Sequence, residues 1–177
     1  MSRITLITYF DEEQLKKIDK CIKDINFQMC KVPYGINDDK RYEIDNLPYH
    51  FTIFATNKEN QKKLLNVANN IEINKIKLKI NKVKIMNAKH NSTVLYLGIE
   101  DNNDIKKLQK NFYEVIPGEN YNPENFTFHI TLHIDKNEKV IYELLEKIQS
   151  RFKPFCIEFN KLALFDYPGE MIELIEL

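Results

Sequence analysis

Apolar and polar residues alternate along the chain with two different periods, which predict strands and helices in turn. Strands are predicted where every second residue is apolar, or where β-branched and aromatic residues cluster, over 3–10, 49–55, 75–85, 93–99, 126–134, 155–167 and 171–177. Helices are predicted where apolar residues recur every three or four positions, over 15–25, 64–71, 105–115 and 140–148. The alternation slips at Asn81-Lys82, which predicts a β-bulge there.

The order of the predicted elements is nearly the same in the two halves of the chain. Each half contains a strand, a helix, a strand, a helix and a strand, and a hairpin turned at Pro168-Gly169 closes the second half. The halves share little sequence identity, so the repeat is one of pattern. We therefore expect an α/β (α+β) protein that is a single domain over residues 1–177, with two pseudo-symmetric lobes and mainly antiparallel sheets.

One predicted strand in each half carries the same four-residue motif. His50-Phe51-Thr52-Ile53 and His129-Ile130-Thr131-Leu132 both read histidine, apolar, threonine, apolar. Because residues two apart in a strand point to one face, each strand presents an imidazole and a hydroxyl together, with the apolar residues packed behind them. The alternative is that the histidines are buried core residues and the threonines are simply strand formers. The matched placement in matched halves favours catalysis.

Two imidazoles on facing lobes suit the displacement of an oxygen at phosphorus. Histidine can take and give a proton near neutral pH. One ring would activate the nucleophile and the other would protonate the leaving oxygen. Each proton transfer accelerates the reaction by about 10²–10⁴-fold. Threonine hydroxyls can donate to the non-bridging phosphate oxygens. No cluster of carboxylates lies near either motif, so a two-metal phosphodiesterase site is not indicated. We expect neither a metal nor a cofactor.

The charge balance excludes one class of function. The chain has 26 basic and 26 acidic residues, whereas a sequence-blind binder of polyanions needs a positive excess. The segment 73–99 nevertheless holds six lysines and no acid. The lysines at 75, 77 and 79 are expected on the solvent-exposed face of an amphipathic strand. The alternative is that they form a row that binds the phosphate groups of a nucleic-acid backbone.

Aromatic and basic residues in two loops are candidates for substrate binding. Lys31, Tyr34 and Arg41 lie in the long irregular segment 26–48, and Tyr121 lies in the loop 120–125. Such pairs suit stacking on a base and contact with a phosphate, although tyrosines also fix loops by packing. His133, two residues after Thr131, is expected on the same face of its strand and at the rim of the site.

Cysteine usage and hydropathy bear on the location of the protein. The three cysteines, Cys21, Cys30 and Cys156, are an odd number without metal-type spacing, which indicates reduced thiols. No apolar run approaches the ~20 residues of a membrane span, and the N-terminal segment does not resemble a signal peptide. We expect a cytoplasmic monomer that has no membrane association and no obligate protein partner.

The twin motifs, one in each half, and the Leu47-Pro48-Tyr49 segment before the first resemble the two-histidine (2H) phosphoesterase superfamily. The nearest branch is that of the bacterial 2′-5′ RNA ligase (LigT-like) proteins. The resemblance implies a bilobed fold around a central cleft and metal-independent hydrolysis of 2′,3′-cyclic phosphate or 2′-5′ phosphodiester bonds in RNA ends or nucleotides, with reversible 2′-5′ RNA ligation in some members. It implies that His50, Thr52, His129 and Thr131 form the catalytic quartet.

One difference from the family keeps a second function open. Many LigT-like proteins have an arginine shortly after the second motif, where this chain has His133-Ile134-Asp135-Lys136. The alternative to an enzyme is therefore a nucleotide- or RNA-end-binding module of the same fold without efficient turnover.

Overall fold

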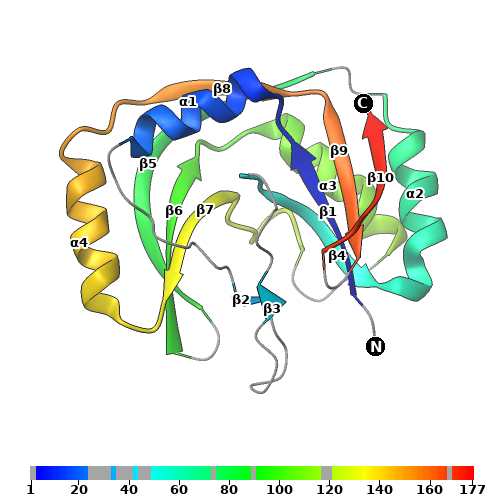
Figure 1. Cartoon of the computed structure of the whole chain (residues 1–177). Coiled ribbons are helices and arrows are strands. Elements are labelled where there is room, and N and C mark those ends of the chain that lie inside the picture. Colours follow the sequence, from blue (N-terminus) through cyan, green and yellow to red (C-terminus); the bar gives the residue numbers. More distant parts are fainter. Residues whose placement is uncertain are drawn as a thin grey trace.

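Two four-stranded antiparallel sheets form the centre of the molecule, and helices lie on their outer sides (Figure 1). The structure is a computed structural model. It describes residues 3–23, 49–72, 75–88, 91–116, 121–166 and 169–177, together with the backbone of 33–34 and 42–43. This architecture confirms the expected α+β class with antiparallel sheets.

The first sheet has the strand order β10-β9-β1-β4, and its strands are β10 (Met171–Glu176), β9 (Lys161–Asp166), β1 (Arg3–Tyr9) and β4 (Thr52–Asn57). The second sheet has the order β7-β6-β5-β8, and its strands are β7 (His129–Asp135), β6 (Ser92–Ile99), β5 (Ile76–Ala88) and β8 (Phe155–Phe159). Two short strands, β2 (Pro33–Tyr34) and β3 (Tyr42–Glu43), pair with each other.

The helices are α1 (Glu12–Ile22), the single 3-10 turn η1 (Lys58–Asn60), α2 (Gln61–Asn69), α3 (Asn103–Val115) and α4 (Glu138–Gln149). In three of them a polar residue accepts a hydrogen bond from the first turn, namely Asp11 at α1, Asn102 at α3 and Asn137 at α4. None of the helices in the described part of the chain is long and apolar enough to cross a membrane.

Each sheet combines strands from both halves of the chain. Strand β5, from the first half, lies in the second sheet, whereas β9 and β10, from the end of the chain, complete the first. The expectation of one strand over 155–167 is wrong, because the chain leaves the second sheet after Phe159 and enters the first at Lys161. The predicted slip at Asn81 is confirmed, since the pairing of β5 with β6 shifts between Ile80 and Lys82.

The core is continuous between the two sheets. Leu6 and Phe54 of the first sheet and Leu78 and Leu97 of the second are fully buried members of one hydrophobic cluster.

Cys21 and Cys156 are free thiols, and Cys30 lies outside the described residues. Burial of the Cys21 thiol raises its pKa, which keeps the thiol protonated at neutral pH.

Candidate active site

The first motif lies at the start of β4, in the edge position of its sheet. Thr52 opens the strand and pairs with Ile7 of β1. His50 and Thr52 are partly exposed, whereas Phe51 and Ile53 are buried, with 1% and 0% of their surfaces accessible. The imidazole and the hydroxyl thus alternate with core residues, as the sequence pattern predicts.

A buried threonine of the neighbouring strand holds the backbone of this motif. The Thr8 hydroxyl accepts a hydrogen bond from the Phe51 N–H at 3.1 Å, and the Thr8 N–H donates to the Phe51 carbonyl, also at 3.1 Å. Phe51 lies between His50 and Thr52, so these bonds set the direction in which both side chains leave the strand. The sequence carries no local signal for this role, because Thr8 is 43 residues away from Phe51.

The second motif begins β7 and is held from two sides. His129 pairs with Gly98 of β6 and Thr131 pairs with Tyr96. The His129 ring meets the Tyr96 ring edge-on, with centroids 5.4 Å apart. Its Nδ1 lies 2.7 Å from the Thr127 carbonyl oxygen. A carbonyl can only accept, so Nδ1 carries the hydrogen and Nε2 of the neutral ring carries the free electron pair.

Burial also sets the ionisation of this part of the site. Removal from water lowers the pKa of His129 below its ordinary value, and the hydrogen bond to the Thr127 carbonyl opposes that effect only in part. The ring is therefore neutral at pH 7. Burial raises the pKa of Tyr96, which keeps its hydroxyl protonated beside the imidazole. Sequence reasoning did not single out Tyr96, although it precedes Gly98 by the two residues that place both on one face.

Both motifs end in a β-bulge at their fourth residue. In the pairing of β1 with β4, Leu6 and Ile7 oppose Phe54 and Thr52, so Ile53 is the extra residue. In the pairing of β6 with β7, Leu95 and Tyr96 oppose His133 and Thr131, so Leu132 is the extra residue. A bulge bends the strand and reverses the alternation beyond it. The bulge is therefore repeated in the two sheets, together with the motif.

The second bulge overturns the expectation for His133. Without it, His133 would share a face with His129 and Thr131. With Leu132 as the extra residue, His133 instead lies opposite Leu95, a core residue, and is itself 9% exposed. Its Nε2 is 3.6 Å from a carboxylate oxygen of Asp135. Burial lowers the pKa of His133 even though Asp135 acts to raise it. The expectation that His133 lies at the rim of the site is thus wrong.

The other sequence candidates divide into two groups. The Tyr121 ring packs against Phe54 and Phe126, with centroids 5.3 and 5.2 Å away, and its hydroxyl accepts a hydrogen bond from Arg3 at 3.3 Å. These contacts are those of a residue that fixes its loop. Lys31, Arg41 and the side chain of Tyr34 lie outside the described residues.

The lysines before the bulge of β5 form part of an exposed, ion-paired surface. Lys75 lies 2.9 Å from Glu158, and Lys79 lies 3.1 Å from Glu100. Lys77 is exposed on the same side of the strand. These contacts are typical of the solvent-exposed face of an amphipathic strand.

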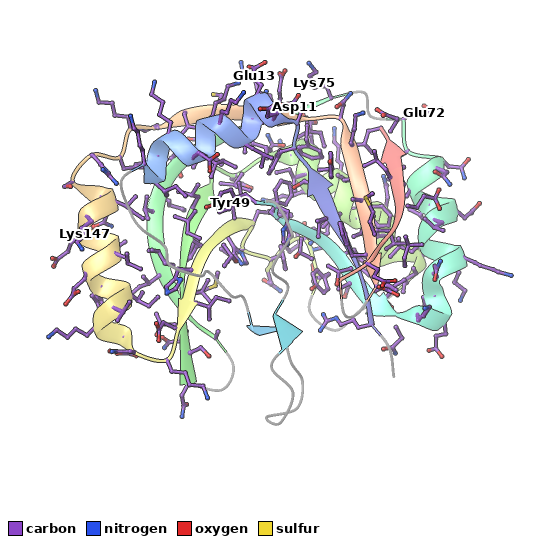
Figure 2. The ribbon with its side chains drawn as sticks, viewed as in Figure 1. Asp11, Glu13, Tyr49, Glu72, Lys75 and Lys147 are labelled. Carbon is purple, nitrogen blue, oxygen red and sulfur yellow. The ribbon has the colours of Figure 1, made fainter. Side chains whose placement is uncertain are left out.

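The segments that bear the two motifs meet in the core. The ring of Phe51, next to His50, contacts the ring of Phe128, next to His129, edge to face, with centroids 6.2 Å apart. Figure 2 shows Tyr49, the residue before His50, in the middle of the molecule between the two sheets. Two histidine strands from opposite lobes are therefore joined by a direct side-chain contact at the positions adjacent to the histidines.

Comparisons with known proteins agree with this arrangement. The family model of the 2′-5′ RNA ligase superfamily matches residues 28–170. Escherichia coli LigT in its apo form is 16% identical, with 99% of this chain and 94% of that chain covered and a TM-score of 0.60. The same protein solved with 3′-AMP is 14% identical, with 99% and 95% covered and a TM-score of 0.55.

A protein from a yeast has the same fold. Kluyveromyces marxianus Usb1, solved with uridine monophosphate, is 12% identical, with 99% of this chain and 98% of that chain covered and a TM-score of 0.59. At these identities the likeness to LigT and Usb1 shows the fold. The search of curated proteins finds no match.

Proposed function

Because the chain belongs to the 2′-5′ RNA ligase superfamily, we propose that it is a two-histidine phosphoesterase acting on 2′,3′-cyclic phosphate or 2′-5′ phosphodiester bonds of RNA ends or nucleotides. The observation that carries the proposal is the contact between Phe51 and Phe128, which joins the two histidine segments. The nucleotides bound by LigT and Usb1 support a nucleotide as the substrate class.

The surroundings of His129 support its role as the general base. Its ring is neutral at pH 7 because burial lowers its pKa, and its Nδ1 hydrogen is held by the Thr127 carbonyl. Nε2 is then the nitrogen that accepts a proton. In hydrolysis of a 2′,3′-cyclic phosphate, His129 takes a proton from the attacking water and His50 gives a proton to the ribose oxygen that leaves phosphorus. The products are a phosphomonoester and a free hydroxyl.

The same pair of histidines accounts for ligation. A 5′-hydroxyl in place of water attacks the cyclic phosphate, the bond from phosphorus to the 3′-oxygen breaks, and a 2′-5′ linkage remains. The hydroxyls of Thr52 and Thr131, each two residues from a histidine on one side of its strand, donate to the non-bridging oxygens. No step in this scheme requires a metal ion or a cofactor.

The test is turnover in a chelating buffer. Purified protein in EDTA is assayed with nucleoside 2′,3′-cyclic monophosphates and 2′-5′ dinucleotides, together with His50→Ala, His129→Ala and the control His133→Gln. We expect turnover by the wild type, a loss of about 10²–10⁴-fold in each of the first two variants, and a near-normal rate in His133→Gln, whose side chain lies on the other face of the strand.

Two results would overturn the proposal. One is the absence of turnover of every substrate, and binding of a nucleotide that stays chemically unchanged for hours would then identify a binding module without catalysis. The other is full activity in both His50→Ala and His129→Ala.

We further propose that the chain acts as one cytoplasmic, monomeric domain over residues 1–177. Each sheet contains strands from both halves of the chain, and the hydrophobic core is continuous between the sheets. Both observations support a single domain. The free thiols of Cys21 and Cys156 are compatible with a reducing compartment. Sedimentation of the purified protein as a 21.1 kDa species would support the monomer.

A further inference from the structure

A row of three paired residues crosses the second sheet through His129. Lys82 on β5 pairs with Gly98 on β6, and Gly98 pairs with His129 on β7. Directly paired residues carry their side chains on the same face of a sheet, so Lys82 and His129 share a face. Adjacent strands are about 4.8 Å apart, which places the Cα atoms of Lys82 and His129 about 10 Å apart.

Gly98 allows the side chain of Lys82 to lie across β6. A Cβ atom at position 98 would stand 2.6 Å from both Cγ and Cε of Lys82 and 3.1 Å from its Cδ. The lysine stem therefore occupies the space that any other side chain at position 98 would fill. It runs from β5 onto β6, in the direction of His129. A glycine inside a strand weakens it and marks a close approach, and here the approaching group is the lysine.

The corresponding row of the first sheet is built differently. Strands β9, β1 and β4 occupy the places that β5, β6 and β7 occupy in the second sheet. There Lys161 on β9 pairs with Tyr9 on β1, so a tyrosine stands where the second sheet has glycine. The Lys161 ammonium is 2.6 Å from a carboxylate oxygen of Glu176. The first sheet thus holds its lysine in an ion pair at the β9–β10 edge.

We propose that Lys82 binds the non-bridging phosphate oxygens of the substrate beside His129, an inference that rests on the function proposed above. A hydrogen bond from an ammonium to a phosphate oxygen is charge-assisted and stronger than one between neutral groups. The contact supplies a positive charge where negative charge gathers on the oxygens during displacement. It makes the two lobes unequal, with the cation on the side of the proposed base.

The test compares three lysine-to-methionine variants. Lys82→Met keeps most of the apolar stem over Gly98 and removes the charge. Lys84→Met is the matched control, because Lys84 lies two residues along the same strand and pairs with Tyr96. Lys161→Met is the control from the other lobe. We expect kcat/KM for 2′,3′-cyclic nucleotides to fall about 10–100-fold in Lys82→Met, and less than about 3-fold in either control.

A steric variant removes the contact without removing a charge. In Gly98→Ala the new methyl group collides with the Lys82 stem and displaces it. We expect a loss in kcat/KM similar to that of Lys82→Met, and no further loss when the two changes are combined, because both remove the same contact. Circular dichroism and thermal unfolding show whether the Gly98→Ala protein is folded. If it is unfolded, the comparison of Lys82→Met with Lys84→Met and Lys161→Met tests the proposal.

Binding of 3′-AMP, measured by calorimetry or NMR titration, separates this inference from the proposed function. A wild type that binds 3′-AMP about 10–100-fold more tightly than Lys82→Met supports the role of Lys82 even if nothing is turned over. Equal affinity in Lys82→Met and Lys84→Met overturns it even if the wild type is an active enzyme. Failure of the wild type to bind 3′-AMP also overturns it.

Discussion

The buried hydroxyl of Thr8 is hydrogen-bonded to both backbone groups of Phe51. It accepts from the Phe51 N–H at 3.1 Å and donates to the Phe51 carbonyl at 3.5 Å. Thr8→Val keeps the shape of the side chain and leaves the Phe51 N–H without this acceptor. We expect the free energy of unfolding to fall by about 1–3 kcal/mol, and kcat/KM to fall because His50 and Thr52 flank the freed peptide. Urea unfolding and the phosphodiesterase assay measure the two effects.

Thr5→Val is the matched control for this prediction. Thr5 lies on the same strand but on its opposite face, and it is partly exposed. A surface change of this kind shifts the free energy of unfolding by less than about 0.5 kcal/mol. Equal effects of Thr8→Val and Thr5→Val on stability and on rate would show that the Thr8 hydroxyl does not hold the motif.

Stability should depend on pH through His129 and His133. Burial lowers the pKa of both below the ordinary 6.5, so below about pH 6.5 the unfolded chain binds more protons than the folded chain. The free energy of unfolding therefore falls as the pH is lowered through this value. We expect the wild type to be less stable to urea at pH 5.5 than at pH 7.5, and His133→Leu to show a smaller difference. A wild type that is equally stable at both pH values would contradict this.

The carbonyl of the first bulge residue depends on a buried glutamine. Gln109 of α3 is fully buried, and its Nε2 donates to the Ile53 carbonyl at 3.0 Å. Gln109→Leu leaves that carbonyl without this donor, and we expect a loss of about 1–3 kcal/mol in the free energy of unfolding. Because Ile53 follows Thr52, kcat/KM should also fall.

Gln149→Leu provides the comparison for this change. Gln149 of α4 donates to the Val83 carbonyl at 3.1 Å, but the residue is exposed and the hydrogen bond only partly buried, so water can replace it. We expect a smaller loss of stability than for Gln109→Leu, and no change in rate. A larger loss of stability for Gln149→Leu would indicate that burial of the hydrogen bond does not determine how much its removal lowers the free energy of unfolding.

The contact between Phe51 and Phe128 should couple stability to activity. A double-mutant cycle with Phe51→Leu and Phe128→Leu is expected to give a coupling of about 0.5–1.5 kcal/mol in the free energy of unfolding. Each single variant should also lower kcat/KM, because the two rings join the segments next to the histidines.

A second aromatic pair separates stability from catalysis. Phe152 and Phe155 form a similar edge-to-face contact at 6.3 Å, away from both motifs. Leucine at these two positions should show coupling in stability and an unchanged rate. Lowered rates in both pairs alike would mean that loss of activity only reports loss of stability.

Features that depend on neighbouring residues were predictable from the sequence. The slip of the alternation at Asn81-Lys82 is such a local pattern, and the structure has it. The alternation around His50 and His129 is local as well, because two successive residues of a strand always point to opposite faces. The sequence by itself therefore determined the four helices, most of the strands and the two motifs.

Only the tertiary structure decided which strands pair and in what register. The bulges at Ile53 and Leu132 arise from pairing with β1 and β6, and the second one turns His133 into the core. The approach of Lys82 to Gly98 depends on the register between β5 and β6. A shift of one residue moves every later side chain to the other face of its sheet, and that shift is set by partners far away in the sequence. The motifs were therefore readable along the chain, whereas the groups that surround them are set by strand pairing.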